Sequence, residues 1–179
     1  MPQYHKIAVL GAGSWGTALA LQLARNSQYP ILWDRNAEIL RQMSRQRQNV
    51  RYLPGIDLPE TINCVHELFE ALSGVDAITV VVPSEGFRDV LQQIAGILNG
   101  DPSPPIVWAT KGLESKTAKF LHQVIEEELG AQTKKAILSG PSFAKEVALG
   151  LPTAVTVAAE NLEFASQVAS LFHGERFRV

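Results

Sequence analysis

The chain has 179 residues, of which 46% are hydrophobic, and a formal net charge of −2 at pH 7. This length suits one domain or at most two, with enough apolar content for a substantial core. Because the charges are mixed and nearly balanced, nothing favours a nucleic-acid or membrane partner. The single cysteine, Cys64, excludes an internal disulfide and favours a reducing compartment, which we take to be the cytoplasm.

Short β-rich runs alternate with helical patterns along the chain. Strands are predicted at 6–10, 30–34, 76–82, 105–109, 135–139 and 153–159, with a weaker one at 61–65. Helices are predicted at 14–26, 36–46, 66–73, 84–98, 115–129, 142–149 and 161–172. This alternation is typical of an α/β fold of the Rossmann type, with a doubly wound, mostly parallel sheet and helices on both faces.

Gly11, Gly13 and Gly16 join the first predicted strand to the first helix. In a dinucleotide-binding fold Gly11 would allow the tight turn, Gly13 would admit a pyrophosphate, and Gly16 would let the helix pack closely on the strand. The first helical turn, with Ser14 and Trp15, would offer free N–H groups to the phosphates. The alternative is a structural glycine-rich turn, since the triplet alone is weakly specific.

The second predicted strand ends in Asp34, about as far beyond Gly16 as a ribose-binding carboxylate is expected. Arg35 follows directly, and a guanidinium in this place would hold the 2′-phosphate of NADP. Asp34 favours NAD and Arg35 favours NADP, so the preference stays open. A solvated turn is the alternative for both residues.

The segment 46–60 interrupts the alternation with polar residues, prolines and a glycine, and we interpret it as a mobile loop. After the strand at 76–82, Pro83 and Ser84 would turn the chain across the edge of a cofactor cleft. Phe87 would then lie against a cofactor ring or, equally, belong to an apolar helix face.

Two further strand ends carry polar residues. Lys111, beside Gly112, follows the strand at 105–109 and would bind an anionic substrate or polarise its oxygen. Gly140 and Ser142 follow the strand at 135–139, where the first turn of a helix would form a second anion site. The alternatives are a surface lysine and a helix capped by a serine.

Together, Gly11-Ala-Gly-Ser-Trp-Gly-Thr-Ala-Leu-Ala20, Val81-Val-Pro-Ser84, Ala109-Thr-Lys-Gly-Leu-Glu114 and Ser139-Gly-Pro-Ser-Phe-Ala-Lys-Glu146 closely resemble bacterial NAD(P)-dependent glycerol-3-phosphate dehydrogenase. The resemblance covers essentially the whole chain. It implies hydride transfer between dihydroxyacetone phosphate and sn-glycerol 3-phosphate, which supplies the glycerophospholipid backbone. It also implies a homodimer for the intact enzyme.

The resemblance implies roles for individual residues. Ser14, Trp15, Arg35 and Ala144 would contact NAD(P), and Tyr52 is a weaker candidate for the same role. Lys111 would lie near both cofactor and substrate, and Gly140 and Ser142 would lie on the substrate side.

The sequence ends at Val179, and members of the family continue into a helical domain that supplies the general-base lysine. We therefore expect this chain to be the NAD(P)-binding Rossmann domain, 1–179, with no general base and little or no turnover alone. Four separated histidines, at positions 5, 66, 122 and 173, predict no metal site. A β-hydroxyacid or sugar-nucleotide dehydrogenase and a non-enzymatic NAD(P)(H) sensor are the alternatives.

Overall fold

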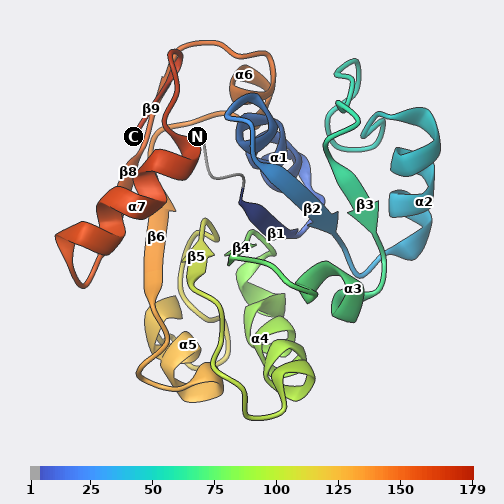
Figure 1. The fold of residues 1–179 in the computed structure, drawn as a ribbon. Coiled ribbons are helices and arrows are strands. Elements are labelled where there is room, and N and C mark those ends of the chain that lie inside the picture. Colours follow the sequence, from blue (N-terminus) through green and yellow to red (C-terminus); the bar gives the residue numbers. More distant parts are fainter. Residues whose placement is uncertain (1–4) are drawn as a thin grey trace.

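The computed structural model describes residues 5–179, and their fold is a central sheet with helices packed on both sides (Figure 1). The elements follow the predicted alternation. They are β1 (Lys6–Leu10), α1 (Ser14–Arg25), β2 (Tyr29–Trp33), α2 (Ala37–Gln46), β3 (Asn63–Val65), α3 (Leu68–Leu72), β4 (Ala77–Val80), α4 (Ser84–Leu98), β5 (Ile106–Trp108), α5 (Leu121–Leu129), β6 (Lys135–Ser139), α6 (Ala144–Ala148), β7 (Thr153–Ala154), β8 (Thr156–Ala159), α7 (Leu162–Phe172) and β9 (Phe177–Arg178).

The main sheet has the strand order β3-β2-β1-β4-β5-β6-β8 within the described residues. All neighbours pair in parallel except β8, which runs antiparallel to β6 at one edge. This order confirms the predicted Rossmann-type fold. The chain reverses its direction of travel between β1 and β4, so the carboxyl ends of these two strands form the crevice in which such folds bind ligands.

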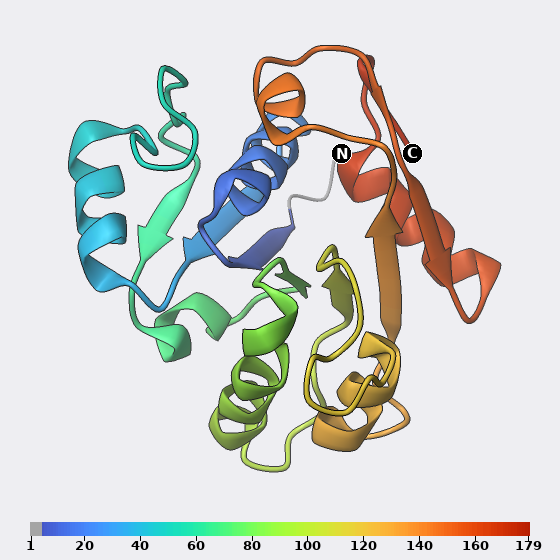
Figure 2. The same ribbon diagram turned by 180° about the vertical axis from the view of Figure 1, so that it is seen from behind.

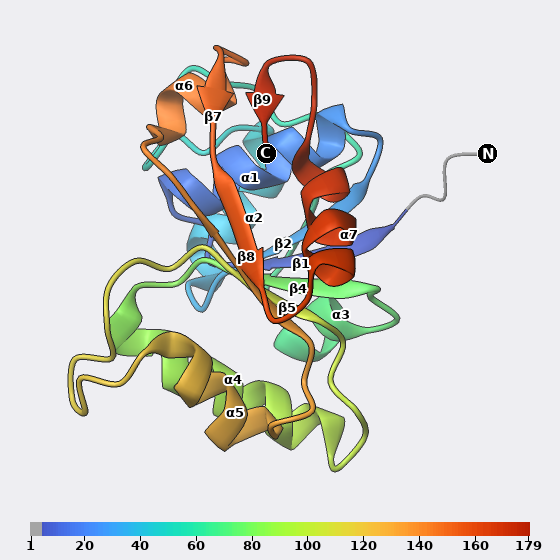
Figure 3. The same ribbon diagram turned by 90° about the vertical axis from the view of Figure 1, so that its left-hand side faces the viewer.

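Each face of the sheet has its own core. In β1, Ile7 and Val9 join the cluster under α1, α2, α6 and α7, whereas Ala8 and Leu10 join the cluster under α3, α4 and α5. This division follows from the alternation of side chains along a strand. Figure 3 shows α1, α6 and α7 on one side of the sheet and α4 and α5 on the other.

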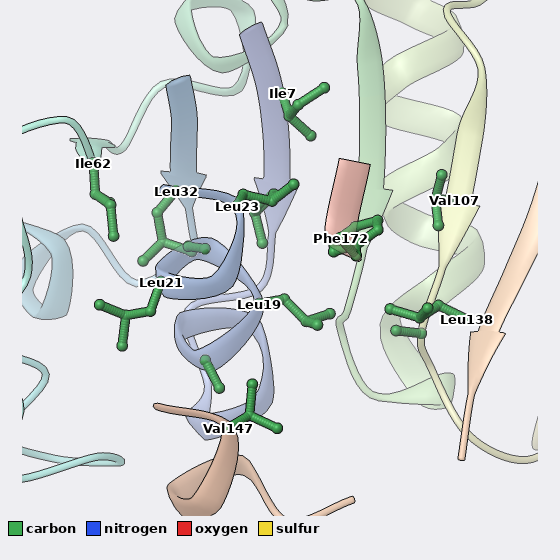
Figure 4. Packing of buried hydrophobic residues seen from close by; sticks show 14 of the residues in the cluster. Ile7, Leu19, Leu21, Leu23, Leu32, Ile62, Val107, Leu138, Val147 and Phe172 are labelled. Atoms are coloured by element: carbon green, nitrogen blue, oxygen red, sulfur yellow. The ribbon is translucent and has the colours of Figure 1, made fainter. Parts of the chain in front are cut away.

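Helix α1 is buried along most of its length, which fixes the turn before it. Leu19 and Leu23 are fully buried, and Figure 4 shows them with Phe172 of α7 and Leu138 of β6 in one apolar cluster. Because buried side chains in protein interiors are closely packed, we expect α1 to have little freedom to shift against the sheet.

Two elements differ from the sequence prediction. The helix expected at 115–129 begins only at Leu121, and Ala118 before it adopts a left-handed backbone conformation (φ +55°) that ends any regular helix there. The strand expected at 153–159 is divided at Val155 into β7 and β8. β7 leaves the main sheet to pair with β9 in a second small sheet.

Within residues 5–179, none of the helices is both long and apolar enough to cross a membrane.

Candidate functional site

A cavity of about 970 Å³ opens at the carboxyl ends of β1, β2, β4 and β5. This is the size of a typical cofactor site and the place where the fold binds ligands. Eleven of the predicted site residues line it, namely Gly11, Gly13, Ser14, Trp15, Gly16, Asp34, Arg35, Tyr52, Lys111, Ser142 and Ala144. The structure therefore brings these residues together from five separate stretches of the chain.

The three glycines of the β1–α1 turn have distinct geometries. Gly11 has φ +116°, and a Cβ there would lie 3.0 Å from the Val81 carbonyl carbon. A Cβ on Gly16 would lie 1.8 Å from the Gly11 carbonyl oxygen, a contact that no side chain can make. Gly13 has an ordinary φ of −68°, and its Cβ would meet no atom of the described chain within 4 Å. Close packing thus requires Gly11 and Gly16, whereas Gly13 leaves room for a ligand.

The N-terminus of α1 opens into the cavity. Gly13 is its N-cap residue, and within the described part of the chain no side chain caps it and no acidic residue lies in its first turn. The N–H groups at the start of a helix have no partner within it, and the helix dipole makes this end positive. The geometry can therefore hold the phosphates of a dinucleotide on backbone N–H groups.

Asp34 lines the cavity and also braces the glycine turn. Its Oδ2 accepts a hydrogen bond of 2.9 Å from the Ala12 N–H, and its Oδ1 accepts one of 3.0 Å from the Asn36 N–H. Arg35 beside it is exposed on the cavity wall. Asp34 thus holds the backbone of the glycine turn, a role that the sequence did not indicate. Its predicted hydrogen bond to a ribose hydroxyl stays a prediction.

The loop between α2 and β3, which carries Tyr52, is held by several hydrogen bonds. Arg47 donates from Nε to the Leu58 carbonyl (3.2 Å) and from Nη2 to the Ile62 carbonyl (3.0 Å). Asn49 anchors the other end of the loop and is almost completely buried. The interpretation of 46–60 as a mobile loop is not supported by these bonds, because its turns are fixed to the core.

Lys111 is placed by the residue before it. The Thr110 hydroxyl is buried and donates a hydrogen bond of 2.7 Å to the Val82 carbonyl, which ties the end of β5 to the end of β4. Lys111 then emerges at the cavity wall with an exposed side chain. An ammonium group here can bind a phosphate or a carbonyl oxygen of a ligand.

The loop after Lys111 is held by an ion pair between the partly buried Arg88 and the buried Glu114. Arg88 of α4 contacts both carboxylate oxygens of Glu114, with 2.6 Å from Nε to Oε1 and 2.9 Å from Nη2 to Oε2. The same guanidinium binds Glu127 and Glu128 of α5, the helix that packs beside α4 in Figure 2. Hydrogen bonds from Arg88 and from the Thr117 hydroxyl lower the pKa of Glu114 from 4.5 to about 2, outweighing desolvation.

The segment after β6 differs in detail from its prediction. Helix α6 begins at Ala144, with Phe143 as its N-cap residue, so Pro141 and Ser142 precede the helix and do not form its first turn. Ser142 and Ala144 still line the cavity. Gly140 is not among the lining residues, and a Cβ there would lie 2.9 Å from the Val155 Cα. A second backbone segment packs closely against the Cβ side of Gly140, whose backbone stays partly exposed, and its predicted substrate contact stays a prediction.

Phe87 corrects one of the predicted cofactor contacts. Its side chain is fully buried among Val90, Leu91 and Ile94 of α4, in the core on that face of the sheet. A ligand in the cavity has no surface of Phe87 to touch. The alternative, an apolar helix face, is the role that the structure shows.

Replacing Phe87 with alanine is expected to destabilise the fold by about 3–5 kcal/mol, because it leaves a large cavity in a closed core. Phe69→Ala is the matched control, since Phe69 is 70% exposed, and it is expected to change the stability by less than about 0.5 kcal/mol. Urea unfolding measures both variants. Equal stability of the two variants would contradict the core role of Phe87.

Within residues 5–179, no three His, Cys, Asp or Glu side chains are grouped so as to hold a metal ion.

Comparison with known proteins identifies the family. Residues 6–165 match the family model described as NAD-dependent glycerol-3-phosphate dehydrogenase N-terminus. Over 174 residues the chain is 49% identical to glycerol-3-phosphate dehydrogenase [NAD(P)+] of Xylella fastidiosa, an alignment that covers 97% of this chain and 50% of the relative. The chain thus spans about half the length of the curated relatives it matches.

Solved structures agree with this match. A glycerol-3-phosphate dehydrogenase from Coxiella burnetii superposes with a TM-score of 0.92 at 45% identity, covering 98% of this chain and 53% of that chain. A UDP-D-ManNAc dehydrogenase from Pyrococcus horikoshii reaches a TM-score of 0.72 at 16% identity, over 97% of this chain and 46% of the other, which shows a shared fold alone. The chain belongs to the NAD-dependent glycerol-3-phosphate dehydrogenase family and matches its N-terminal part.

Proposed function

We propose that this chain binds NAD(H) or NADP(H) in the cavity beside α1. We also propose that it forms the nucleotide-binding part of a glycerol-3-phosphate dehydrogenase that interconverts dihydroxyacetone phosphate and sn-glycerol 3-phosphate. The observation that carries this proposal is the meeting of the Gly11–Gly16 turn with Lys111 and Ser142 in one cavity. A dinucleotide site and an anion-binding lysine would then lie within reach of each other.

Different residues of the cavity would bind the cofactor and the substrate, according to the chemistry of their groups. Backbone N–H groups of Ser14 and Trp15 would bind the pyrophosphate, and Asp34 or Arg35 would face the adenosine ribose. Bound NAD(P)H supplies the hydride that the ketone carbon of dihydroxyacetone phosphate accepts. Lys111 would hold the substrate phosphate or polarise the ketone oxygen, and the Ser142 hydroxyl would donate a hydrogen bond to the substrate.

Calorimetric titration with NADH and with NADPH, without and with dihydroxyacetone phosphate, tests this function. We expect a nucleotide to bind and the phosphate ester to strengthen its binding. In Lys111→Ala we expect the nucleotide still to bind but the strengthening to fall at least tenfold, because the cation that faces the phosphate is gone. Lys116→Ala, in the same loop but outside the cavity wall, is the control.

The outcomes separate the alternatives. If dihydroxyacetone phosphate leaves the nucleotide affinity unchanged, the result would favour a sensing module over a dehydrogenase. Strengthening by a sugar nucleotide or a β-hydroxyacid instead would favour one of the related dehydrogenases. Tighter binding of NADH would show that Asp34 sets the cofactor preference, and tighter binding of NADPH would show that Arg35 does. A cytoplasmic location and a homodimer of the intact enzyme remain part of this proposal.

A further inference from the structure

We propose that Asn49 is a positioning residue of the dinucleotide site, one that locks the glycine turn to the loop that carries Tyr52. This inference rests on the proposed function, because it assigns a role in the binding of the same nucleotide. Asn49 does not line the cavity, so it acts through the residues that it holds.

Asn49 is unusual because a polar side chain in an irregular loop is 1% exposed. A buried amide is tolerated only where hydrogen bonds replace the lost water. Its Nδ2 donates to the Ala12 carbonyl (2.9 Å) and to the Thr17 hydroxyl (2.8 Å), and its Oδ1 accepts from the Tyr52 N–H (3.1 Å). Both amide hydrogens and the carbonyl oxygen are therefore used.

The partners of Asn49 are Tyr52, which lines the cavity, and two buried residues of the glycine turn and of α1, Ala12 and Thr17. Ala12 lies between Gly11 and Gly13, and its N–H is already held by the Asp34 carboxylate. With Asn49 on its carbonyl oxygen, Ala12 is held through both of its backbone polar groups. This fixes the direction of the turn before α1, and hence the direction of the first N–H groups of the helix.

The loop that carries Tyr52 is also held in place by hydrogen bonds and by a buried side chain. The Leu53 N–H donates to the Asn49 carbonyl (2.9 Å), and the Leu53 side chain is buried in the core under α1. Arg47 binds the far side of the same loop through the carbonyls of Leu58 and Ile62. Tyr52 is thus carried on a loop that is anchored at both ends, with Asn49 as its link to the glycine turn.

The consequence is a site that is formed before the ligand arrives. A binding site that must first order its loops loses part of its affinity to that ordering. Without the Asn49 amide, the Ala12 carbonyl and the Thr17 hydroxyl each lose a hydrogen-bond donor in a buried site that water does not reach. The glycine turn and Tyr52 are then no longer linked and can move independently. We expect Asn49→Ala to weaken NADH binding at least tenfold in protein that remains folded.

The experiment combines hydrogen exchange in the free protein with calorimetric titration by NADH and NADPH. Asn49→Ala is compared with Gln48→Ala, whose side chain bonds only to Asp57 on the exposed side of the same loop. We expect Asn49→Ala to speed exchange at the Tyr52 amide and in residues 11–16 and to lower nucleotide affinity, and Gln48→Ala to do neither.

Thr17 supplies a second test that needs no change at Asn49. Thr17→Ser keeps the hydroxyl that Asn49 binds and is expected to retain the affinity, whereas Thr17→Val removes it and is expected to lower the affinity. If Asn49→Ala does not fold, this pair decides the question.

Three results would overturn the proposal. Unchanged nucleotide affinity in folded Asn49→Ala, or equal affinities of Thr17→Ser and Thr17→Val, would reduce Asn49 to a purely structural residue. Failure of the unsubstituted protein to bind either nucleotide would overturn the proposed function, and this role with it. If the unsubstituted protein binds a nucleotide, the proposed function stands, and a negative result with the variants then counts against the role of Asn49 alone.

Discussion

Gly16→Ala is expected to destabilise the protein by about 3 kcal/mol, at the upper end of the usual cost of overpacking. The added Cβ would lie 1.8 Å from the Gly11 carbonyl oxygen, which is backbone and cannot rotate away. Helix α1 would have to move from the sheet, and its buried leucines would lose contacts on the way. Urea unfolding measures the loss.

Gly13→Ala is the matched control for the same turn. Its backbone conformation suits alanine, and its Cβ meets no described atom within 4 Å, so we expect the stability to change by less than about 0.5 kcal/mol. The methyl group would instead occupy the space that a pyrophosphate needs, and NADH affinity is expected to fall at least tenfold. A stable Gly16→Ala, or a Gly13→Ala that binds normally, would contradict this division of roles.

Arg88→Ala is expected to lower the free energy of unfolding by about 3 kcal/mol, because it leaves the buried Glu114 carboxylate without its cation. The Glu114 carboxylate is 6% exposed and would keep only the Thr117 hydroxyl as a hydrogen-bond partner. The loop from Lys111 to Glu114 would loosen, so we also expect a weaker effect of dihydroxyacetone phosphate on nucleotide binding. Lys119→Ala is the control, because it removes an exposed pair with Glu127 and is expected to change little.

The cost of Arg88→Ala depends on pH in a direction that the Glu114 pKa fixes. This pKa is about 2 in the folded protein and 4.5 as a reference, so the pair stabilises the fold fully above about pH 4.5. The stabilisation is lost as the pH falls from 4.5 toward 2. Unfolding measured at pH 7 and pH 3 should therefore show a larger difference between the two proteins at pH 7. An equal difference at both values would contradict the role of the ionised pair.

Most of the fold was predictable because its signals are local. The continuous apolar run of β4 predicted a central strand, and β4 does lie in the middle of the sheet with all its residues buried. The division of 153–159 was not predictable, because β7 pairs with β9, a strand that is distant from it in the sequence. The late start of α5 was likewise not predictable, because nothing in the local sequence requires the left-handed conformation of Ala118.

The candidate site was predictable where residues follow strand ends. Lys111 and Ser142 were found in this way, because the carboxyl ends of parallel strands meet at one edge. Phe87 was assigned wrongly, although its spacing from Val90, Leu91 and Ile94 already indicated one helix face. Asn49 was missed because its partners Ala12 and Thr17 are distant in sequence, and a polar residue in a polar loop gives no signal of burial.

We propose that a dinucleotide binds with its phosphates at the N-terminus of α1. Amide chemical shifts of the isotopically labelled protein, followed during titration with NADH, test this binding mode. We predict that the largest changes fall on Gly13, Ser14 and Trp15, with further changes at Lys111, and that Gly150 and Gly174, at the smaller cavity beside Arg25, stay unchanged. Saturating shifts at that smaller cavity, with none at Gly13–Trp15, would contradict binding of the phosphates at α1.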